Sequence, residues 1–358
     1  MGNVLIMPKQ SKEFVQGLFE VLGVEANAAE IVADHLTQAE MRGLASHGLS
    51  RIPFYTAKLR GGGYKAAPHM CIVRESESCA LLDADDALGA VAGRQAMELA
   101  MVKARQSGCG TVAVCHCNHI GFLAYYTMMA AQQGMVGLAL CNSGASTAVW
   151  GTRQRVLGTN PLSVCLPAQR HDCVVFDGAT SVVAQGKVAV ANIEGRPIPS
   201  SWAYGPGGEP TADAALALQG AMCPAGGYKG SGLAMVISLL CAGLTDMPFD
   251  MEAENLRRIH EDSQGSELGA FFSAVDIGRF TSLNSFTRRV DGFINAVKAF
   301  PPAPGFEEIL VPGEIEARSA RRAETEGFTI SCQLYDLLRT VAAPYGLDAQ
   351  MAAWRHLR

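Results

Sequence analysis

Six short apolar segments between residues 71 and 179 constrain the fold more than any other feature of the sequence. They read CIVRES, CALLDA, GTVAVCHC, MVGLALCN, LSVCLPA and CVVFDGA, and Gly, Asp, Asn or Pro bounds them. Segments of this length and composition predict β-strands. Two stretches with helical periodicity, 92–108 and 122–134, lie between them, and AFFSAVDI at 270–277 predicts a further strand. The sequence therefore predicts a mixed α/β core.

The N-terminal part of the chain has the pattern of amphipathic helices. Residues 11–42 predict two of them, the first capped by Ser11 and the second ended by Gly43. A third helix is expected to begin near Ser46 and to run through LSRIPFYTAKLRGGG, with Pro53 limiting its early turns.

The C-terminal part is expected to be helical as well, from Pro312 to Arg358. The apolar run at 230–246 predicts a buried helix, and the polar region 254–267 predicts an exposed loop. We expect the two ends to pack together as a helical layer. This gives three parts: a helical part at 1–70, a mixed α/β core at 71–311, and a helical part at 312–358.

Composition and charge exclude several classes of protein. The net charge is -5 and no basic tract is present, which argues against nucleic acid as a partner. The longest apolar run, 232–244, is shorter than the ~20 residues of a membrane span. The first residues lack the pattern of a signal peptide, and the 11 scattered cysteines suit reduced thiols, so a cytoplasmic protein is expected.

Metal-ligand residue types cluster tightly at one place, CHCNH at 115–119. A zinc site would need a second ligand group at a suitable spacing, and none is obvious in the sequence. No metal site is therefore predicted. The phosphate-binding fingerprint G-x-G-x-x-G is also missing between any strand and helix, so a nicotinamide cofactor would have to bind without the common motif.

The stretch SHGLSR at 46–51 is the first candidate for chemistry. If Ser46 caps a helix, His47 and Arg51 lie four residues apart on one face. Arginine can hold a carboxylate with two hydrogen bonds, and histidine can donate or accept a proton near neutral pH. Hydride transfer to a 2-oxo acid needs both functions. The alternative is an ordinary helix start with solvated side chains, and the stretch alone favours that alternative.

Two further stretches combine polar side chains with turns. In CNHIGFLAYY, Asn118 and His119 close a strand and Gly121 opens a helix whose backbone N–H groups could bind an anion. In LGTNPLSVCLPA, Thr159 and Asn160 lie in a turn and could contact substrate oxygens. A structural turn explains each of them too.

Two glycine-rich or small-residue stretches could lie against a cofactor. In VFDGATSVVAQGK, Asp177 ends a strand and small residues follow, which permits close approach of a flat ligand or of another backbone. In GGYKGSG, Lys229 stands at the start of the helix predicted at 230–246 and suits a phosphate. A tight strand crossing and a surface turn are the respective alternatives.

Taken together and in this order, the stretches resemble the type 2 malate/L-lactate dehydrogenase family of NAD(P)-dependent oxidoreductases. The resemblance covers about residues 12–330 and rests on RGLASHGLSRIPFY, CNHIGFLAYY, LGTNPLSVCLPA, VFDGATSVVAQGK, GGYKGSGLAM and ILVPGE. It implies a fold distinct from the Rossmann type, NAD or NADP as cofactor and a small carboxylic acid as substrate. It also implies a homodimer with the active site near the subunit interface.

The resemblance assigns roles to individual residues. His47 matches the proton donor, with Ser46 beside it, and His119 matches a residue that is catalytic in some members. Arg51 and Thr159 match substrate contacts. The residues that match cofactor contacts are His119, Ile120, Gly121, Phe122, Leu123, Ser143, Asp177, Gly178, Ala179, Thr180, Ser181, Tyr228, Lys229, Pro312, Gly313 and Glu314.

Lys187 separates two branches of the family. The reductases of cyclic imino acids carry an aspartate at the position of Lys187, whereas the oxo-acid members commonly carry lysine. The sequence therefore predicts a dehydrogenase of a small 2-oxo or 2-hydroxy acid. A reductase of piperideine- or pyrroline-2-carboxylate is the first alternative, and a catalytically silent nucleotide-binding homologue is the second.

Overall fold

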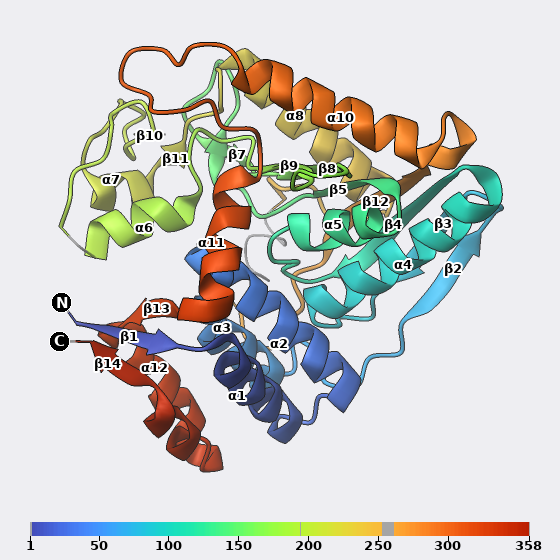
Figure 1. Cartoon of the computed structure of the whole chain (residues 1–358). Helices are drawn as coiled ribbons and strands as arrows, with labels where there is room; N and C mark the ends of the chain where they lie inside the picture. The colour runs from blue at the N-terminus through green and yellow to red at the C-terminus, as the bar shows by residue number, and fades with distance from the viewer. Residues whose placement is uncertain (1, 194, 253–260, 358) are drawn as a thin grey trace.

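The computed structural model describes residues 2–193, 195–252 and 261–357, and Figure 1 traces their path. A seven-stranded sheet forms the centre, in the order β2-β3-β4-β12-β5-β8-β9. Within it β3 and β4 pair parallel, and the other neighbours pair antiparallel. The mixed α/β core and its seven predicted strands are confirmed. The strands are β2 (Cys71–Glu75), β3 (Cys79–Asp83), β4 (Cys109–Cys117), β5 (Met135–Cys141), β8 (Leu162–Leu166), β9 (Val174–Gly178) and β12 (Leu268–Asp276).

Two helices, α4 (Gly89–Ser107) and α5 (Ala124–Gln132), pack against this sheet. Glycines in the strands allow the close contact. A Cβ at Gly110 would lie 2.0 Å from the Ala100 carbonyl oxygen, and one at Gly137 would lie 2.5 Å from that of Thr127. The expectation that Gly121 opens a helix was wrong, because α5 begins three residues later and Gly121 lies in the preceding loop with φ +77°.

The two ends of the chain form one layer with a shared apolar core, as expected. Its helices are α1 (Pro8–Val21), α2 (Ala26–Met41), α3 (Ile52–Gly61), α11 (Glu314–Glu326) and α12 (Cys332–Ala342). Phe14 and Leu18 of α1 are buried in the same core as Leu338 of α12 and Trp354. Ser11 does not cap α1 as predicted. The helix begins at Pro8, and the buried Ser11 hydroxyl bonds Thr37 Oγ1 of α2 at 2.8 Å.

A small sheet joins the two termini, which lie side by side in Figure 1. Its order is β13-β1-β14, built from β1 (Asn3–Ile6), β13 (Phe328–Ser331) and β14 (Arg355–Leu357). The prediction of a wholly helical tail was therefore wrong. Strands of three or four residues carry too little periodicity to be seen in sequence, and these form only because distant segments meet. The boundaries at residues 70 and 311 stay a prediction.

The helix predicted to begin near Ser46 begins only at Ile52. The chain makes two short 3₁₀ turns, η1 (Ala45–His47) and η2 (Leu49–Arg51), before α3 begins at Ile52. Ser46 lies inside the first turn and does not cap a helix. Pro53 occupies the first turn of α3, where its missing N–H costs no helical hydrogen bond.

A third sheet has four strands in the order β10-β11-β6-β7, and two small helices accompany it. Its strands have only two or three residues, which is why none of the four was predicted. Its elements are β6 (Thr147–Ala148), β7 (Arg155–Leu157), β10 (Ala203–Tyr204), β11 (Ala221–Met222), α6 (Gln185–Ile193) and α7 (Ala214–Gln219).

The apolar helix predicted at 230–246 is only half-buried. It forms as α8 (Tyr228–Ser238) and continues into one turn of π-helix, η3 (Leu239–Gly243). Leu233, Val236 and Leu239 are 42%, 51% and 60% exposed. No helix in the described ranges is long and apolar enough to pass through a membrane. Residues 254–260 of the predicted polar loop lie outside the described residues. The remaining elements are η4 (Ile277–Arg279), α10 (Leu283–Lys298), η5 (Ala343–Tyr345) and η6 (Asp348–Ala353).

Candidate active site

Two histidines stack where the helical layer meets the central sheet. His47 comes from η1, and His119 follows the end of β4. Their ring centroids are 5.8 Å apart and their planes differ by 15°. The structure therefore brings together two residues that are 72 positions apart in the sequence.

The His47 ring is held on one side and desolvated. Its Nδ1 lies 3.0 Å from Ser46 Oγ. The segment 184–187 closes over this turn, because a Cβ on Gly186 would lie 3.0 Å from Ser46 Cβ. Burial, followed by the charge of Arg51, lowers the pKa of His47 to about 3. The imidazole is therefore neutral, and among the described residues Nε2 has no hydrogen-bond partner.

The His119 ring is held by a residue that the sequence analysis did not single out. Tyr55 of α3 places its hydroxyl 2.7 Å from His119 Nδ1. Burial, then the charge of Arg51, lowers the pKa of His119 well below its ordinary value. The site thus has two neutral imidazoles beside one fixed positive charge.

The Arg51 guanidinium is oriented by the backbone of the same turn. Its Nε donates to the Ser46 carbonyl oxygen at 2.6 Å. Among the residues that the structure describes, neither of its terminal nitrogens has a hydrogen-bond or ion-pair partner. A partly buried guanidinium with two free N–H₂ groups can take a carboxylate in a bidentate grip.

The turn that carries His47 and Arg51 rests on Glu40 of α2. The buried Glu40 carboxylate accepts a hydrogen bond from the Leu49 N–H at 2.7 Å. A Cβ on Gly48 would lie 2.3 Å from Glu40 Oε1, so only glycine fits between them. Burial raises the pKa of Glu40 to about 7. The sequence showed no signal for this role, because Glu40 reads as an ordinary helix residue.

Thr159 lies in a loop that is organised by the buried Asp250. The Asp250 carboxylate accepts hydrogen bonds from Gly158 N (2.9 Å), Asn160 Nδ2 (2.7 Å) and Asn142 Nδ2 (3.0 Å), as well as from Ser238 Oγ (3.0 Å). Thr159 N in turn donates to Ser143 Oγ at 3.1 Å. One carboxylate therefore positions both Ser143 and Thr159, and the sequence analysis missed it.

Asp250→Asn is expected to lower the free energy of unfolding by roughly 2–4 kcal/mol. The amide would turn an N–H₂ group toward donors that now meet an oxygen acceptor. The matched control is Asp213→Asn, which keeps an N-cap acceptor for Ala215 and Leu216 at the surface and should be nearly neutral. Chemical denaturation of both variants tests this, and equal stabilities would contradict it.

The predicted cofactor segment 119–123 has most of its side chains buried. Ile120, Phe122 and Leu123 are buried in the main core. Gly121 is pressed against a buried histidine of α2, since a Cβ there would lie 2.0 Å from His35 Cε1. Within 120–123, therefore, no side chain is turned toward the site, and His119 is the residue of this segment whose side chain lies there.

The other predicted cofactor residues follow one another along a connected edge. Asp177 Oδ2 accepts from Ala124 N at 2.8 Å, at the start of α5. Thr180 N and Oγ1 both donate to the Thr159 carbonyl oxygen, at 2.8 and 2.9 Å. Ala225 N donates to the Thr180 carbonyl oxygen at 2.8 Å, which brings the start of α8, with the exposed Tyr228, to the same edge. Gly178, Ala179, Ser181 and Lys229 lie within these segments.

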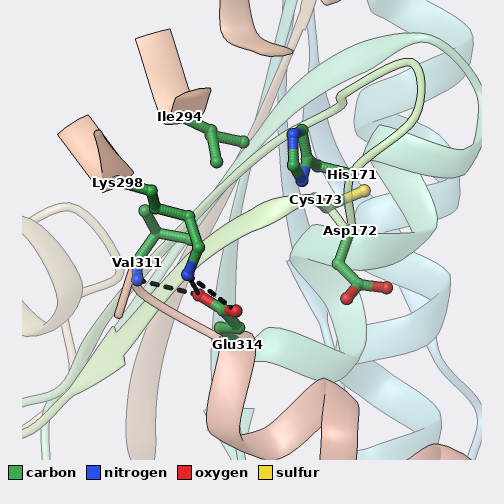
Figure 2. A pocket seen from close by; sticks show the side chains of 7 residues that line it. All are labelled: His171, Asp172, Cys173, Ile294, Lys298, Val311 and Glu314. Atoms are coloured by element: carbon green, nitrogen blue, oxygen red, sulfur yellow. Dashed lines mark hydrogen bonds and ion pairs between the residues drawn. The ribbon is translucent and has the colours of Figure 1, made fainter. Parts of the chain in front are cut away.

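The segment 312–314 packs beside β9, and its one carboxylate, that of Glu314, is bound by Lys298. The Pro312 carbonyl oxygen accepts from Val175 N at 3.0 Å, and a Cβ on Gly313 would lie 2.7 Å from Val175 Cβ. Figure 2 shows Glu314 joined to Lys298 of α10, with Nζ–Oε2 at 2.8 Å. The cavity there has a volume of about 30 Å³, room for one water molecule. The cofactor contact of Glu314 stays a prediction.

Comparison with known proteins shows which family carries this arrangement. The sequence pattern of the malate/L-lactate dehydrogenase family matches residues 6–339. The L-sulfolactate dehydrogenase of Methanocaldococcus jannaschii is 34% identical over 97% of this chain and 99% of its own length. The chain belongs to the malate/L-lactate dehydrogenase family. It is thus an NAD(P)-dependent 2-hydroxyacid dehydrogenase by family, acting on CH–OH groups.

Solved structures of this family have the same fold. Malate dehydrogenase from Entamoeba histolytica superposes with a TM-score of 0.92 at 26% identity, covering 96% of this chain and 98% of that one. Delta1-piperideine-2-carboxylate reductase from Pseudomonas syringae pv. tomato superposes with a TM-score of 0.84 at 28% identity, covering 94% and 99%. The names of two other relatives include a cofactor, which is NAD(+) for a ureidoglycolate dehydrogenase and NADP(+) for a (2R)-3-sulfolactate dehydrogenase.

Two exposed aromatic side chains of the dehydrogenase flank this edge of loops. Gly121 and Gly158 leave no room for a Cβ, because His35 and Ser143 fill the space beside them. Trp150 and Tyr228 are each 63% exposed beside it, in contact through Gly227, where a Cβ would lie 2.8 Å from Trp150 Cζ3. Exposed aromatic faces are groups on which nucleotide rings can stack.

Proposed function

We propose that this dehydrogenase transfers hydride between NAD or NADP and a small 2-hydroxy or 2-oxo acid, and that Arg51 holds the substrate carboxylate. One observation carries the proposal. The terminal nitrogens of Arg51 have no partner among the described residues, and two neutral histidines stand beside them. An anionic acid whose C2 hydroxyl loses a proton as C2 gives up a hydride, or regains it in the reverse direction, needs this combination.

His47 is the acid–base residue in this proposal. In the oxidising direction neutral His47 accepts the proton of the C2 hydroxyl through Nε2, while Ser46 Oγ at 3.0 Å from Nδ1 fixes the ring. In the reducing direction protonated His47 returns that proton to the alkoxide oxygen. Thr159 makes a second contact to the substrate, and His119, stacked on His47, lines the same side of the site. The bound nicotinamide supplies or accepts the hydride.

The cofactor residues proposed here are the backbone of 119–123, Ser143, 177–181, and Tyr228 and Lys229. Pro312, Gly313 and Glu314 complete the set. Support comes from the connected hydrogen bonds Ala124–Asp177, Thr159–Thr180 and Thr180–Ala225, which place these segments along one edge. The proposal includes both NAD and NADP as possible cofactors, because the names of relatives include each of them.

A substrate panel tests the function. Malate, L-lactate, sulfolactate and ureidoglycolate are offered with NAD(+) and with NADP(+), and the matching 2-oxo acids with the reduced cofactors. Reduced-nicotinamide absorbance should change with at least one acid of this class. Absence of turnover with every acid, together with tight cofactor binding, would favour a silent nucleotide-binding homologue instead.

A reductase of cyclic imino acids is the second candidate. The fold match to delta1-piperideine-2-carboxylate reductase supports it. Against it stands Lys187, in the segment that closes over Ser46 where imino-acid reductases carry an aspartate. Including piperideine-2-carboxylate in the panel separates the two, and a higher kcat/KM for the imine than for every oxo acid would reverse our choice.

The pH profile should show an unusually acidic base. Burial and Arg51 lower the pKa of His47 from 6.5 to about 3, so the base stays deprotonated well below pH 6.5. We expect kcat/KM for 2-hydroxy acid oxidation to hold as the pH falls through 6.5. Arg51→Met removes one cause of the lowered pKa and should move the acidic limb to higher pH. A wild-type limb at 6.5 would contradict this.

We also propose a homodimer. The structure leaves large apolar side chains exposed on two helices, including Leu233, Val236 and Leu239 on α8 and η3 and Phe293, 67% exposed, on α10. A groove of about 600 Å³ runs along α10, with Leu166, Phe286 and Val290 in its walls. Monomeric proteins rarely expose such surfaces. Light scattering at micromolar concentration should give twice the chain mass of 37.9 kDa, and a monomer would refute the proposal.

A further inference from the structure

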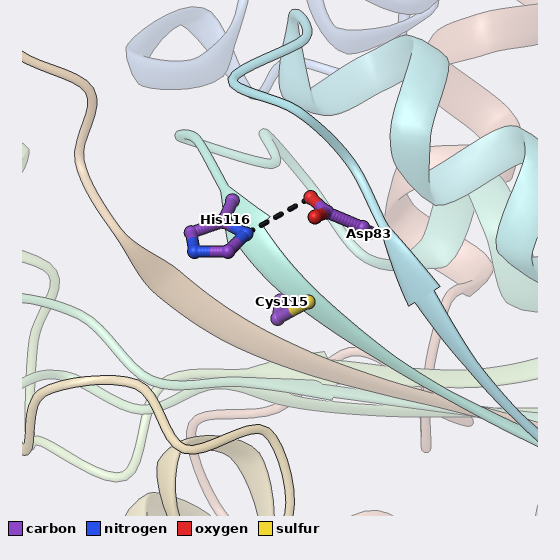
Figure 3. Close-up of side chains that lie close together, drawn as sticks. All are labelled: Asp83, Cys115 and His116. Carbon is purple, nitrogen blue, oxygen red and sulfur yellow. Dashed lines mark hydrogen bonds and ion pairs between the residues drawn. The ribbon is translucent and has the colours of Figure 1, made fainter. Parts of the chain in front are cut away.

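A second cluster of reactive side chains lies on the central sheet, outside the site described above. Asp83 ends β3, and Cys115 and His116 lie near the end of the neighbouring strand β4. Their ligand-type atoms all lie within 4.8 Å of one another. Figure 3 shows His116 turned toward Asp83 with Cys115 beside them. No other group of three or more such residues meets this criterion within the described ranges.

A bulge in β4 brings two consecutive side chains to this place. Leu268 of β12 pairs with Cys117 and Ala270 pairs with Val114, so Cys115 and His116 together oppose a single residue, Gly269. Consecutive strand residues normally point to opposite faces, and a bulge re-aims one of them. His116 adopts φ +46°, a left-handed conformation that costs a residue with a side chain about 1–3 kcal/mol.

The three side chains have few competing partners. His116 Nδ1 donates to Asp83 Oδ1 at 2.9 Å, and the Asp85 N–H donates to the same oxygen at 2.8 Å. The Cys115 thiol makes one long contact, 3.6 Å to the Leu82 carbonyl oxygen. One hydrogen bond therefore joins His116 to Asp83, and the Asp85 N–H helps to orient that carboxylate.

We propose that Asp83, Cys115 and His116 form a binding site for a zinc-type divalent cation. A thiolate, an imidazole nitrogen and a carboxylate oxygen are the ligand types that zinc takes, and three of them leave a fourth position for water. The cation would replace the proton shared by Asp83 and His116. It would also fix the bulged end of β4, three residues before His119. Sequence alone could not show this site, because Asp83 stands 32 residues before Cys115.

Another cysteine, Cys71, is near the cluster but is not one of its ligands. It pairs with Asp83, which in turn pairs with Cys115, so Cys71 and Cys115 are two strands apart. That spacing is about 10 Å, too far for one metal ion or a disulfide to join them. The site is thus complete with three residues of this chain.

Titration with zinc alone tests the proposal. Chelator-treated wild-type chain should bind one zinc per chain in competition with a chromogenic chelator. Cobalt in place of zinc should produce a thiolate-to-cobalt charge-transfer band in the near ultraviolet. Cys115→Ser should abolish that band, and Asp83→Asn and His116→Asn should each weaken zinc binding by at least about tenfold. Circular dichroism checks that each variant is folded, and Asp83→Asn keeps nearly the same side-chain size and shape.

The matched control is Cys79→Ser, which removes an exposed cysteine at the other end of β3 and should bind zinc as wild type does. His119→Asn should likewise leave the cobalt band unchanged. Two results would overturn the proposal: wild-type chain that binds no zinc at micromolar concentration, or a cobalt band that survives Cys115→Ser.

Discussion

His47→Ala is expected to lower turnover by about 10²–10⁴-fold while cofactor affinity stays within a few-fold of wild type. The imidazole is the only group in the proposed chemistry that moves a proton at the reacting oxygen. It lies in η1, outside the proposed cofactor segments, although its ring stacks on His119. Steady-state kinetics in both directions, with nicotinamide fluorescence to measure cofactor binding, check this. His69→Ala, which removes an exposed histidine, is the matched control and should keep wild-type kinetics.

A comparison with His119 decides which of the two histidines is the acid–base residue. If His47→Ala kept more than about a tenth of the wild-type rate, the acid–base role would pass to His119. Tyr55→Phe then becomes informative, because it removes the hydroxyl 2.7 Å from His119 Nδ1 and leaves His47 untouched. With His47 as the acid–base residue, Tyr55→Phe should have a much smaller effect than His47→Ala.

Arg51→Lys is expected to cost roughly 2–3 kcal/mol of transition-state stabilisation, about 30- to 150-fold in kcat/KM, although the charge is kept. Lysine offers a point charge where arginine offers a planar fork. Lysine also loses the bond from Nε to the Ser46 carbonyl oxygen that orients the group. Cofactor affinity should be unchanged, because Arg51 lies outside the proposed cofactor segments.

A substrate analogue separates binding from structure. When the substrate carboxylate is replaced by a neutral amide, the wild-type fork can no longer grip it, and most of the Arg51→Lys penalty should vanish. The measurement is kcat/KM for both enzymes on both substrates. Equal penalties on acid and amide would show that Arg51 mainly supports the 46–51 turn.

The central sheet could be read from sequence because local pattern and tertiary environment agree there. Each strand is a short apolar run with turn residues at both ends, and the seven predicted strands formed within a few residues of their expected bounds. The two amphipathic helices predicted within 11–42 formed as α1 and α2 for the same reason, and Val32, Leu36 and Ala39 lie on the buried face of α2. The family could also be recognised from the sequence, because short motifs in a fixed order are visible without any knowledge of tertiary contacts.

Elements that depend on distant partners escaped prediction. The sheet β13-β1-β14 has strands of three or four residues, and it exists because residues more than 320 positions apart pair, as Asn3 does with Ser331. The turn at Ser46 became two 3₁₀ turns because Glu40 takes the Leu49 N–H and Gly48 packs on that carboxylate. No local pattern around Ser46 contains that contact.

By itself, then, the sequence determined the residue types for the chemistry: a histidine and an arginine four positions apart, and a second histidine after a strand. Only the tertiary structure decided that His47 stacks on His119, that no described residue bonds the terminal nitrogens of Arg51, and that Asp250 positions Ser143 and Thr159. The physical reason is that protonation state and orientation depend on burial and on hydrogen-bond partners. Those partners come from parts of the chain that only folding brings together.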